Sequence, residues 1–142
     1  MMKAVILVLA GSFVFMTGCT ANGPAFSPVE NPDANKAVVY IYRPFNIVGA
    51  GETPDVYIDE VKYGPLKNNG YLVYFVEPGK RMIANKDPHV PEPMAIYPDL
   101  EAGKEYYIRR AYVSNIGSIG IQIAVIPKEY AIQEIKLTKK AD

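Results

Sequence analysis

His89 is the one imidazole of the sequence, and it lies in a proline-rich segment, DPHVPEP, between Asp87 and Glu92. An imidazole beside carboxylates could act as a general base or bind a metal ion. A hydrolase also needs a nucleophile next to its base, however, and the spacing of these three residues matches no recognised metal-binding cluster. We therefore expect no catalytic residue, no metal and no cofactor, and we do not expect an enzyme.

Two other motifs could bind an anion. Gly49 and Gly51 form a short glycine pair, but no helix is predicted directly after it, and a phosphate-binding loop needs a helix N-terminus there. Arg109 and Arg110 are neighbours in a predicted strand, where successive side chains point to opposite faces. We therefore expect no anion site from either motif. The 15 basic and 15 acidic residues give no net charge, which argues against a nucleic-acid partner.

Residues 1–18, MMKAVILVLAGSFVFMTG, have the order of an export signal peptide. Lys3 precedes an apolar run that ends at Met16, short of the roughly 20 residues of a membrane-spanning helix. The sequence Met16-Thr17-Gly18-Cys19 then resembles the lipobox of bacterial lipoproteins, in which the Cys thiol receives a diacylglyceryl group and the leader is removed just before it. The resemblance implies that Cys19, the only cysteine, is lipidated, with an ordinary cleavage site as the alternative.

Thr20 follows the cysteine at the position where inner-membrane retention signals carry Asp. The resemblance to sorting signals therefore implies an outer-membrane location, with the domain facing the periplasm. Residues 20–35, TANGPAFSPVENPDAN, contain three prolines and no hydrophobic period. We predict a lipidated cysteine and flexible tether over residues 19–35, which would let the domain, residues 36–142, stand away from the membrane.

Short apolar runs separated by turn residues fill the chain from Lys36 onward. Their regular spacing predicts an antiparallel β-sandwich, mainly β, of about seven strands. The segment after Pro127 has better helical propensity and predicts a short C-terminal helix over residues 128–140, with an edge strand as the alternative. The predicted strands cover residues 37–43, 55–59, 71–76, 81–85, 95–100, 105–113 and 120–126.

Alternation within strand 37–43 places its tyrosines on one face, with hydroxyls that we expect to reach the rim of the sheet. The alternative is a tyrosine-lined surface around Tyr42, Tyr71 and Tyr107 that would bind a small ligand by stacking. Residues 113–127, VSNIGSIGIQIAVIP, carry no charge and predict a buried strand behind a glycine-rich loop. The alternative there is an apolar edge that contacts a partner through Ile119 and Ile121.

Five short motifs occur in a characteristic order: YIYRP at 40–44, VYID at 56–59, NGY at 69–71, PGK at 78–80 and YYIR at 106–109. This order resembles an uncharacterised family of bacterial lipoproteins, a domain of unknown function. The middle segment, 56–80, is also similar to PEGA-type modules, small sandwiches related to transthyretin-like folds. The resemblance covers about residues 37–135 and implies fold and location but no catalytic residues. Glu60 stands where the pattern has glycine, so we expect a different turn there.

Together these features predict a lipid-anchored periplasmic protein of the bacterial cell envelope that acts as a non-catalytic interaction module. Its expected partners are the membrane, through the lipid on Cys19, and an unidentified envelope protein. The alternative function is a small-ligand carrier that uses the tyrosine-lined surface. A hydrolase built on His89 is the least favoured class, because no second catalytic group accompanies the imidazole.

Overall fold

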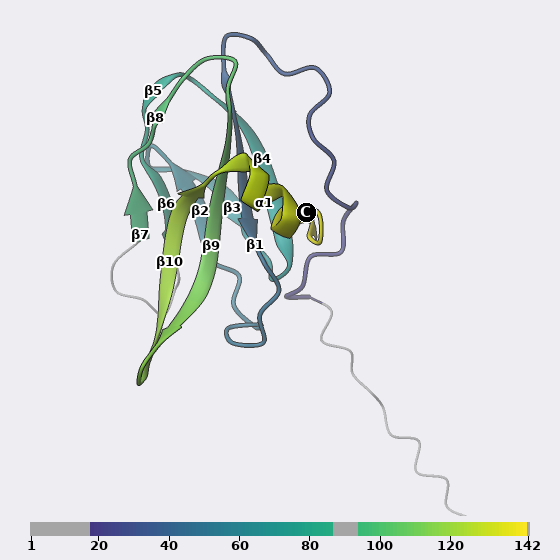
Figure 1. Ribbon diagram of the computed structural model, residues 1–142, viewed down its shortest axis with the longest axis vertical. Helices are drawn as coiled ribbons and strands as arrows, with labels where there is room; N and C mark the ends of the chain where they lie inside the picture. The colour runs from purple at the N-terminus through teal and green to yellow at the C-terminus, as the bar shows by residue number, and fades with distance from the viewer. Residues whose placement is uncertain (1–17, 87–93, 142) are drawn as a thin grey trace, which may run out of the picture.

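The computed structural model describes residues 18–86 and 94–141 (Figure 1). His89 and all but the last residue of the predicted signal peptide lie outside the described residues. Within them the chain is mainly β, as predicted, with one short helix near the C-terminus. The elements are β1 (Ala37–Arg43), β2 (Asp55–Ile58), β3 (Val61–Pro65), β4 (Gly70–Val76), β5 (Gly79–Lys80), β6 (Ile83–Lys86), β7 (Met94–Ile96), β8 (Asp99–Leu100), β9 (Glu105–Asn115), β10 (Ser118–Ile126), α1 (Lys128–Ile135) and β11 (Lys139–Lys140).

The largest sheet has five strands in the order β10-β9-β1-β4-β11, so β1 is central, as its sequence predicts. Every residue of β1, AVVYIYR, is buried, because β-branched and aromatic side chains fill both faces of the strand. The strand pairs antiparallel with β4 and parallel with β9. The prediction of an antiparallel arrangement is therefore wrong for β1–β9 and for β4–β11. A parallel pair needs a long crossover, and β2 to β8 supply it between β1 and β9.

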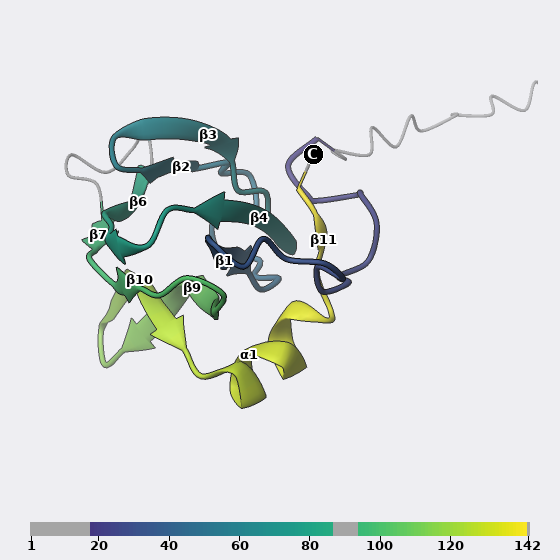
Figure 2. The same ribbon diagram turned by 90° about the horizontal axis from the view of Figure 1, so that it is seen from above.

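A second sheet, with the order β3-β2-β6-β7, lies on one side of the large sheet, and helix α1 lies on the other side (Figure 2). Val39 and Ile41 of β1 share the larger core cluster with Val56, Ile58 and Ile83 of the second sheet. The opposite face of β1 carries its tyrosines into a separate cluster beneath α1. The alternation of side chains along one strand thus divides the interior into two cores.

The turn between β2 and β3 corrects one expectation about Glu60. Ile58 pairs with Val61, so only Asp59 and Glu60 form the loop. Two-residue hairpin loops favour positive φ at both positions, because that backbone twist matches the twist of the strands. Asp59 and Glu60 adopt φ of 48° and 68°, so the turn keeps the positive φ and Glu60 is strained.

The C-terminal segment is a helix as predicted, but a shorter one. Helix α1 follows Pro127 and ends at Ile135 rather than at residue 140. Thr138 closes it, because both its backbone N–H and its hydroxyl donate to the Ile135 carbonyl, at 2.9 and 2.6 Å. The chain beyond is then free to form β11, which pairs parallel with Gly70 and Tyr71 of β4. The predicted helix and its strand alternative therefore both occur, one after the other.

The segment predicted as a flexible tether packs on the domain instead. The Ala21 N–H donates to the Asn68 carbonyl at 2.9 Å, and the Gly23 N–H donates to the Lys140 carbonyl at 3.1 Å. Phe26 packs against the tyrosine cluster. The prolines keep this segment extended, which suits pairing with the edge strand β11, and a single aromatic side chain supplies the apolar contact. Neither the edge pairing nor a single aromatic contact produces a hydrophobic period in the sequence.

Strand β10 is an exposed edge, which overturns the prediction of a buried strand for residues 113–127. Among the described residues it pairs only with β9, and most of its own residues are exposed or half-buried. β1 pairs with β9 no further than Arg109, so the rest of the β9–β10 hairpin extends past the central strand (Figure 1). Lack of charge does not imply burial here, because nothing in the described residues covers the outer part of this hairpin.

Candidate interaction site

The three tyrosines proposed as a ligand-binding surface lie together, but in the interior. Tyr42, Tyr71 and Tyr107 are 0%, 5% and 1% exposed. Ala131 and Ile135 of α1 cover them from one side, and Phe26 covers them from the N-terminal segment. The expectation of a tyrosine-lined surface is therefore wrong, because the helix and the presumed tether cover that face of the sheet. These tyrosines form a core.

Ring contacts hold this tyrosine core together. Tyr40 stacks on Tyr107 with ring centroids 5.0 Å apart, and Phe26 meets Tyr40 and Tyr71 edge to face at 5.4 and 5.2 Å. Such aromatic pairs add about 0.5–1.5 kcal/mol each beyond area burial. The Tyr40 hydroxyl accepts a hydrogen bond from the Val29 N–H at 2.9 Å. The core therefore fixes the N-terminal segment as well as the helix.

Glu134 on α1 is the polar centre at the edge of this core. Its carboxylate accepts a 2.5 Å hydrogen bond from the Tyr42 hydroxyl and forms a 2.9 Å ion pair with Arg109 of β9. Burial, and then the hydrogen bond to Glu134, raise the pKa of Tyr42 far above its usual value. Arg110, the next residue of β9, is buried on the opposite face, where it donates to Asn85. The prediction that Arg109 and Arg110 point apart is confirmed.

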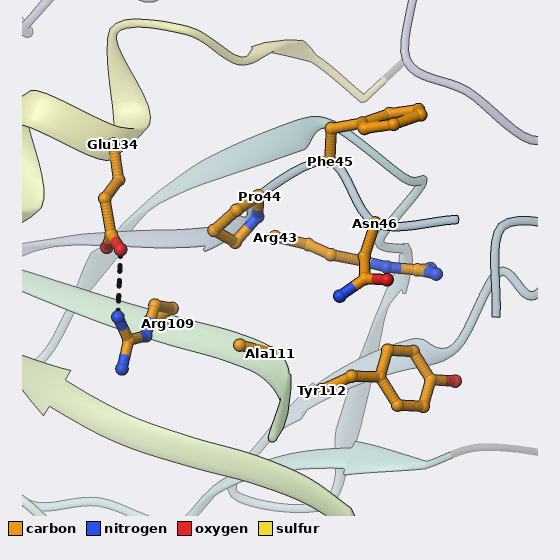
Figure 3. A pocket seen from close by; sticks show the side chains of 8 residues that line it. All are labelled: Arg43, Pro44, Phe45, Asn46, Arg109, Ala111, Tyr112 and Glu134. Atoms are coloured by element: carbon orange, nitrogen blue, oxygen red, sulfur yellow. Dashed lines mark hydrogen bonds and ion pairs between the residues drawn. The ribbon is translucent and has the colours of Figure 1, made fainter. Parts of the chain in front are cut away.

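A cavity of about 170 Å³ opens beside the Arg109–Glu134 pair (Figure 3). The loop after β1 forms one wall, with Pro44, Phe45 and Asn46, and the outer part of β9 forms the floor. Figure 3 shows the guanidinium of Arg109 directed at the Glu134 carboxylate, with Pro44 beside them. Both charged side chains therefore line the hollow.

Two more hollows adjoin this cavity and also reach Glu134, and we call the three together the α1 groove. One extends along α1 past Gln133 to Tyr130, and the other passes Phe45 to Leu137. Phe45, Tyr130 and Leu137 are 66%, 64% and 70% exposed. Three large apolar side chains therefore surround one partly exposed ion pair. That composition suits binding of an amphipathic segment.

The polar groups of the α1 groove are engaged with one another. The Glu134 carboxylate accepts hydrogen bonds from the Tyr42 hydroxyl and from Arg109. Over residues 18–86 and 94–141, no three His, Cys, Asp or Glu side chains gather as a metal site would need. In the same ranges, no helix has the length and apolar character to cross a membrane.

The other predicted site residues lie elsewhere. Ile119 is 62% exposed and Ile121 is half-buried, and both lie on the face of β10 that carries the buried Ile123. Cys19 is half-buried, and its carbonyl accepts a 3.0 Å hydrogen bond from the Asn68 N–H. The sequence reasoning missed the Arg109–Glu134 pair, which joins residues from two distant elements. Only the YYIR motif, which contains Arg109, gave a sequence signal near it.

The fold and the groove define a mainly β, helix-flanked protein whose one described helix forms a wall of its candidate binding site. Residues 33–120 match the model of DUF2846, a family of proteins of unknown function, and the chain belongs to that family. The match spans β1 to β9 and ends before α1, so Glu134 lies outside it. A comparison with curated proteins found no match to this chain.

Proposed function

We propose that the protein is a lipid-anchored, non-catalytic interaction module of the bacterial cell envelope, held by Cys19 in the outer membrane and facing the periplasm. The lipobox-like sequence before Cys19 and the Thr20 that follows it support this location. Acylation fits the energetics of permanent anchoring, since each buried methylene adds about 0.8 kcal/mol and stable anchoring takes more than one chain. We expect no cofactor.

The arrangement of two sheets supports a β-sandwich related to PEGA-type modules. The larger core cluster combines residues of β1 with residues of β2 and β6 from the second sheet. The VYID and PGK motifs that suggest the relationship lie in β2 and around β5. Modules of this kind present loops and edges from a rigid scaffold, which suits binding rather than catalysis.

The observation that carries the proposal is the exposed apolar rim of the α1 groove around the Arg109–Glu134 pair. Covering a large apolar side chain stabilises a complex by about 1.5–3 kcal/mol before the costs of association. Phe45, Tyr130 and Leu137 are all available for this, and each lines a hollow that also reaches Glu134. The Arg109–Glu134 pair is partly exposed, so polar groups of a partner can hydrogen-bond to it while the rim covers the partner's apolar side chains.

The test is site-specific photo-cross-linking in intact cells that produce the full chain. A photoreactive amino acid replaces Tyr130 on the groove rim or, as a matched control, Lys62 on the exposed strand β3 of the other sheet. We expect an adduct of discrete mass from position 130 alone. A Leu137→Asp change should remove this adduct, because it places a charge in the rim, while the protein stays folded since Leu137 is exposed.

The anchor needs its own readout. Mass spectrometry of the purified protein should show acyl groups on Cys19, and a Cys19→Ser chain should leave the membrane fraction. Equal adducts from positions 130 and 62, or an adduct that survives Leu137→Asp, would contradict the role of the α1 groove. A protein without acyl groups on Cys19 would contradict the anchor.

A further inference from the structure

Cys19 occupies a fixed place on the domain. Its carbonyl accepts from the Asn68 N–H at 3.0 Å, and the Asn68 carbonyl accepts from the Ala21 N–H at 2.9 Å. Thr20 thus forms a parallel β-bridge with Asn68, which is fully buried. A lipid on Cys19 would therefore join the domain at one defined point, with no long flexible segment in between. The bilayer would lie next to whatever surrounds that point.

The loop of residues 44–52 is a direct neighbour of this point. Asn46 donates its N–H to the Asn68 side-chain oxygen at 3.1 Å, and the Asn68 amide nitrogen donates to the Asn46 carbonyl at 3.0 Å. The buried Arg43 holds the loop from inside by donating to the Gly49 and Glu52 carbonyls, at 2.6 and 2.7 Å. The loop is therefore attached to the domain from two sides, while Ile47 at its tip is 82% exposed.

The β9–β10 hairpin reaches the same end of the molecule. Gly49 lies against the ring of Tyr112 on β9, so closely that a Cβ on Gly49 would overlap the tyrosine hydroxyl. Tyr112 also donates to the Glu52 side chain. Beyond this contact the hairpin ends in Ile116, which is fully exposed. In Figure 1 the start of the described chain, the loop and the hairpin tip all lie in the lower half of the molecule, and the hairpin tip lies lowest.

Charge is missing from both projecting segments. Residues 44–51, PFNIVGAG, and residues 111–127, AYVSNIGSIGIQIAVIP, contain no Asp, Glu, Lys or Arg. A surface that is both apolar and uncharged is unfavourable in water but avoids the cost of desolvating charge when it enters a membrane interface. The opposite end of the molecule differs, since Lys80, Glu101 and Lys104 lie in or beside β5 and β8.

We propose that Ile47, Val48, Ile116 and Ile119, which we call the apolar end, contact the lipid bilayer into which the acyl chains of Cys19 insert. This inference rests on the proposed anchor and adds an orientation to it. The domain lies against the membrane through the apolar end, with β5 and β8 directed away. The lipid surface is favoured over a protein partner because the anchor itself places a bilayer beside Asn68, and no partner needs to be recruited to cover the apolar end.

The orientation follows from the same contacts that overturn the flexible tether. A free segment would let the domain take any orientation relative to the membrane. With the backbone bridge at Thr20, only rotation about the bonds of the lipidated Cys19 can change that orientation. Two separate apolar tips, the loop and the hairpin, together with the acyl chains define a plane. Shallow insertion of aliphatic side chains beside a lipid anchor strengthens membrane contact without a spanning segment.

Fluorescence quenching by brominated lipids tests this orientation. The chain has no tryptophan, so a single Ile47→Trp or Ile116→Trp change supplies a unique probe, and Lys80→Trp supplies the control at the far end. Each lipidated full-length protein is purified from membranes and reconstituted in phosphatidylcholine vesicles with or without brominated acyl chains. We expect positions 47 and 116 to lose most of their emission and position 80 to lose none.

Each outcome has a distinct meaning. Acylated protein with no quenching at positions 47 and 116 would overturn the orientation and leave the anchor standing. A blue shift at those positions without quenching would overturn it in favour of a protein or second-copy contact. Mass spectrometry that shows no acyl group on Cys19 would overturn both. An added Ile119→Asp change should reduce quenching at position 116, because it brings a charge to the bilayer interface.

Discussion

Raising the pH above about 10 should destabilise the protein steeply, because tyrosines that ionise in the unfolded chain stay protonated in the folded one. Burial raises the pKa of Tyr40, Tyr42 and Tyr107 in the core beneath α1. At Tyr42 the hydrogen bond to Glu134 adds to this effect, and at Tyr107 the charge of Glu105 does. All three hydroxyls therefore resist deprotonation while the protein is folded.

The sign and size of this pH dependence of the free energy of unfolding follow from proton linkage. Below about pH 10 both states keep these protons, so the three tyrosines add no pH dependence. Above it the unfolded chain binds fewer protons, so the free energy of unfolding falls as the pH rises. Each tyrosine contributes up to about 1.4 kcal/mol per pH unit, so the three together contribute at most about 4 kcal/mol per pH unit. A domain of marginal stability then unfolds within a few pH units.

Urea unfolding followed by circular dichroism at a series of alkaline pH values measures this slope, and tyrosinate absorbance reports ionisation directly. Tyr42→Phe should lower the slope by about a third, since it removes one of three linked protons. Tyr97→Phe is the matched control, because Tyr97 lies outside the tyrosine core and is 59% exposed. If every tyrosine ionised near pH 10 while the circular dichroism stayed native, the burial of the tyrosine core would be refuted.

Three further changes test local features of the fold. Glu60→Gly should raise the free energy of unfolding by about 1 kcal/mol, because it removes the strain of a side chain at positive φ. Lys62→Gly in β3 is the control and should lower this free energy by about 0.5–1 kcal/mol. Urea titration measures both changes. Ile135→Ala should cost about 2–5 kcal/mol in the same assay, since Ile135 is fully buried on the core side of α1, while Leu137→Ala at an exposed neighbour should stay within about 0.5 kcal/mol. Gly23→Ala would place a Cβ 2.5 Å from a backbone oxygen of β11, so protease cleavage within residues 20–30 should accelerate, and unchanged cleavage would contradict the packed N-terminal segment.

Most of the strands could be predicted because each strand carries its hydrophobic pattern and turn residues within its own short segment of sequence. The run AVVYIYR forms β1 over the predicted residues 37–43, since β-branched and aromatic residues fill a strand that is covered on both faces. Pro127 marks the start of the helix correctly. The same alternation placed Tyr42 with Tyr40, but it could not say whether that face meets water or a helix. Only the path of the chain after β10 decides that.

The errors share one physical origin, which is pairing between segments far apart in the chain. The N-terminal segment looks flexible by composition, yet β11 offers it an edge and the tyrosine core offers Phe26 a pocket. Strand β10 looks buried by composition, yet it lies at the edge of its sheet. The parallel pairing of β1 with β9 has no local signature at all, because it depends on the whole crossover through the second sheet.

The tyrosine core and the α1 groove depend on each other through one short element. Helix α1 has eight residues, fewer than the roughly 12–15 that an isolated helix needs to be even marginally stable in water. It is therefore held in place by the core, through the buried Ala131 and Ile135, and by the contacts of Glu134 with Tyr42 and Arg109. Tyr130 and Glu134, which line the groove, belong to that same helix. Any change that loosens the core must then move a wall of the groove, so the tyrosines influence binding by placing the helix rather than by touching a ligand.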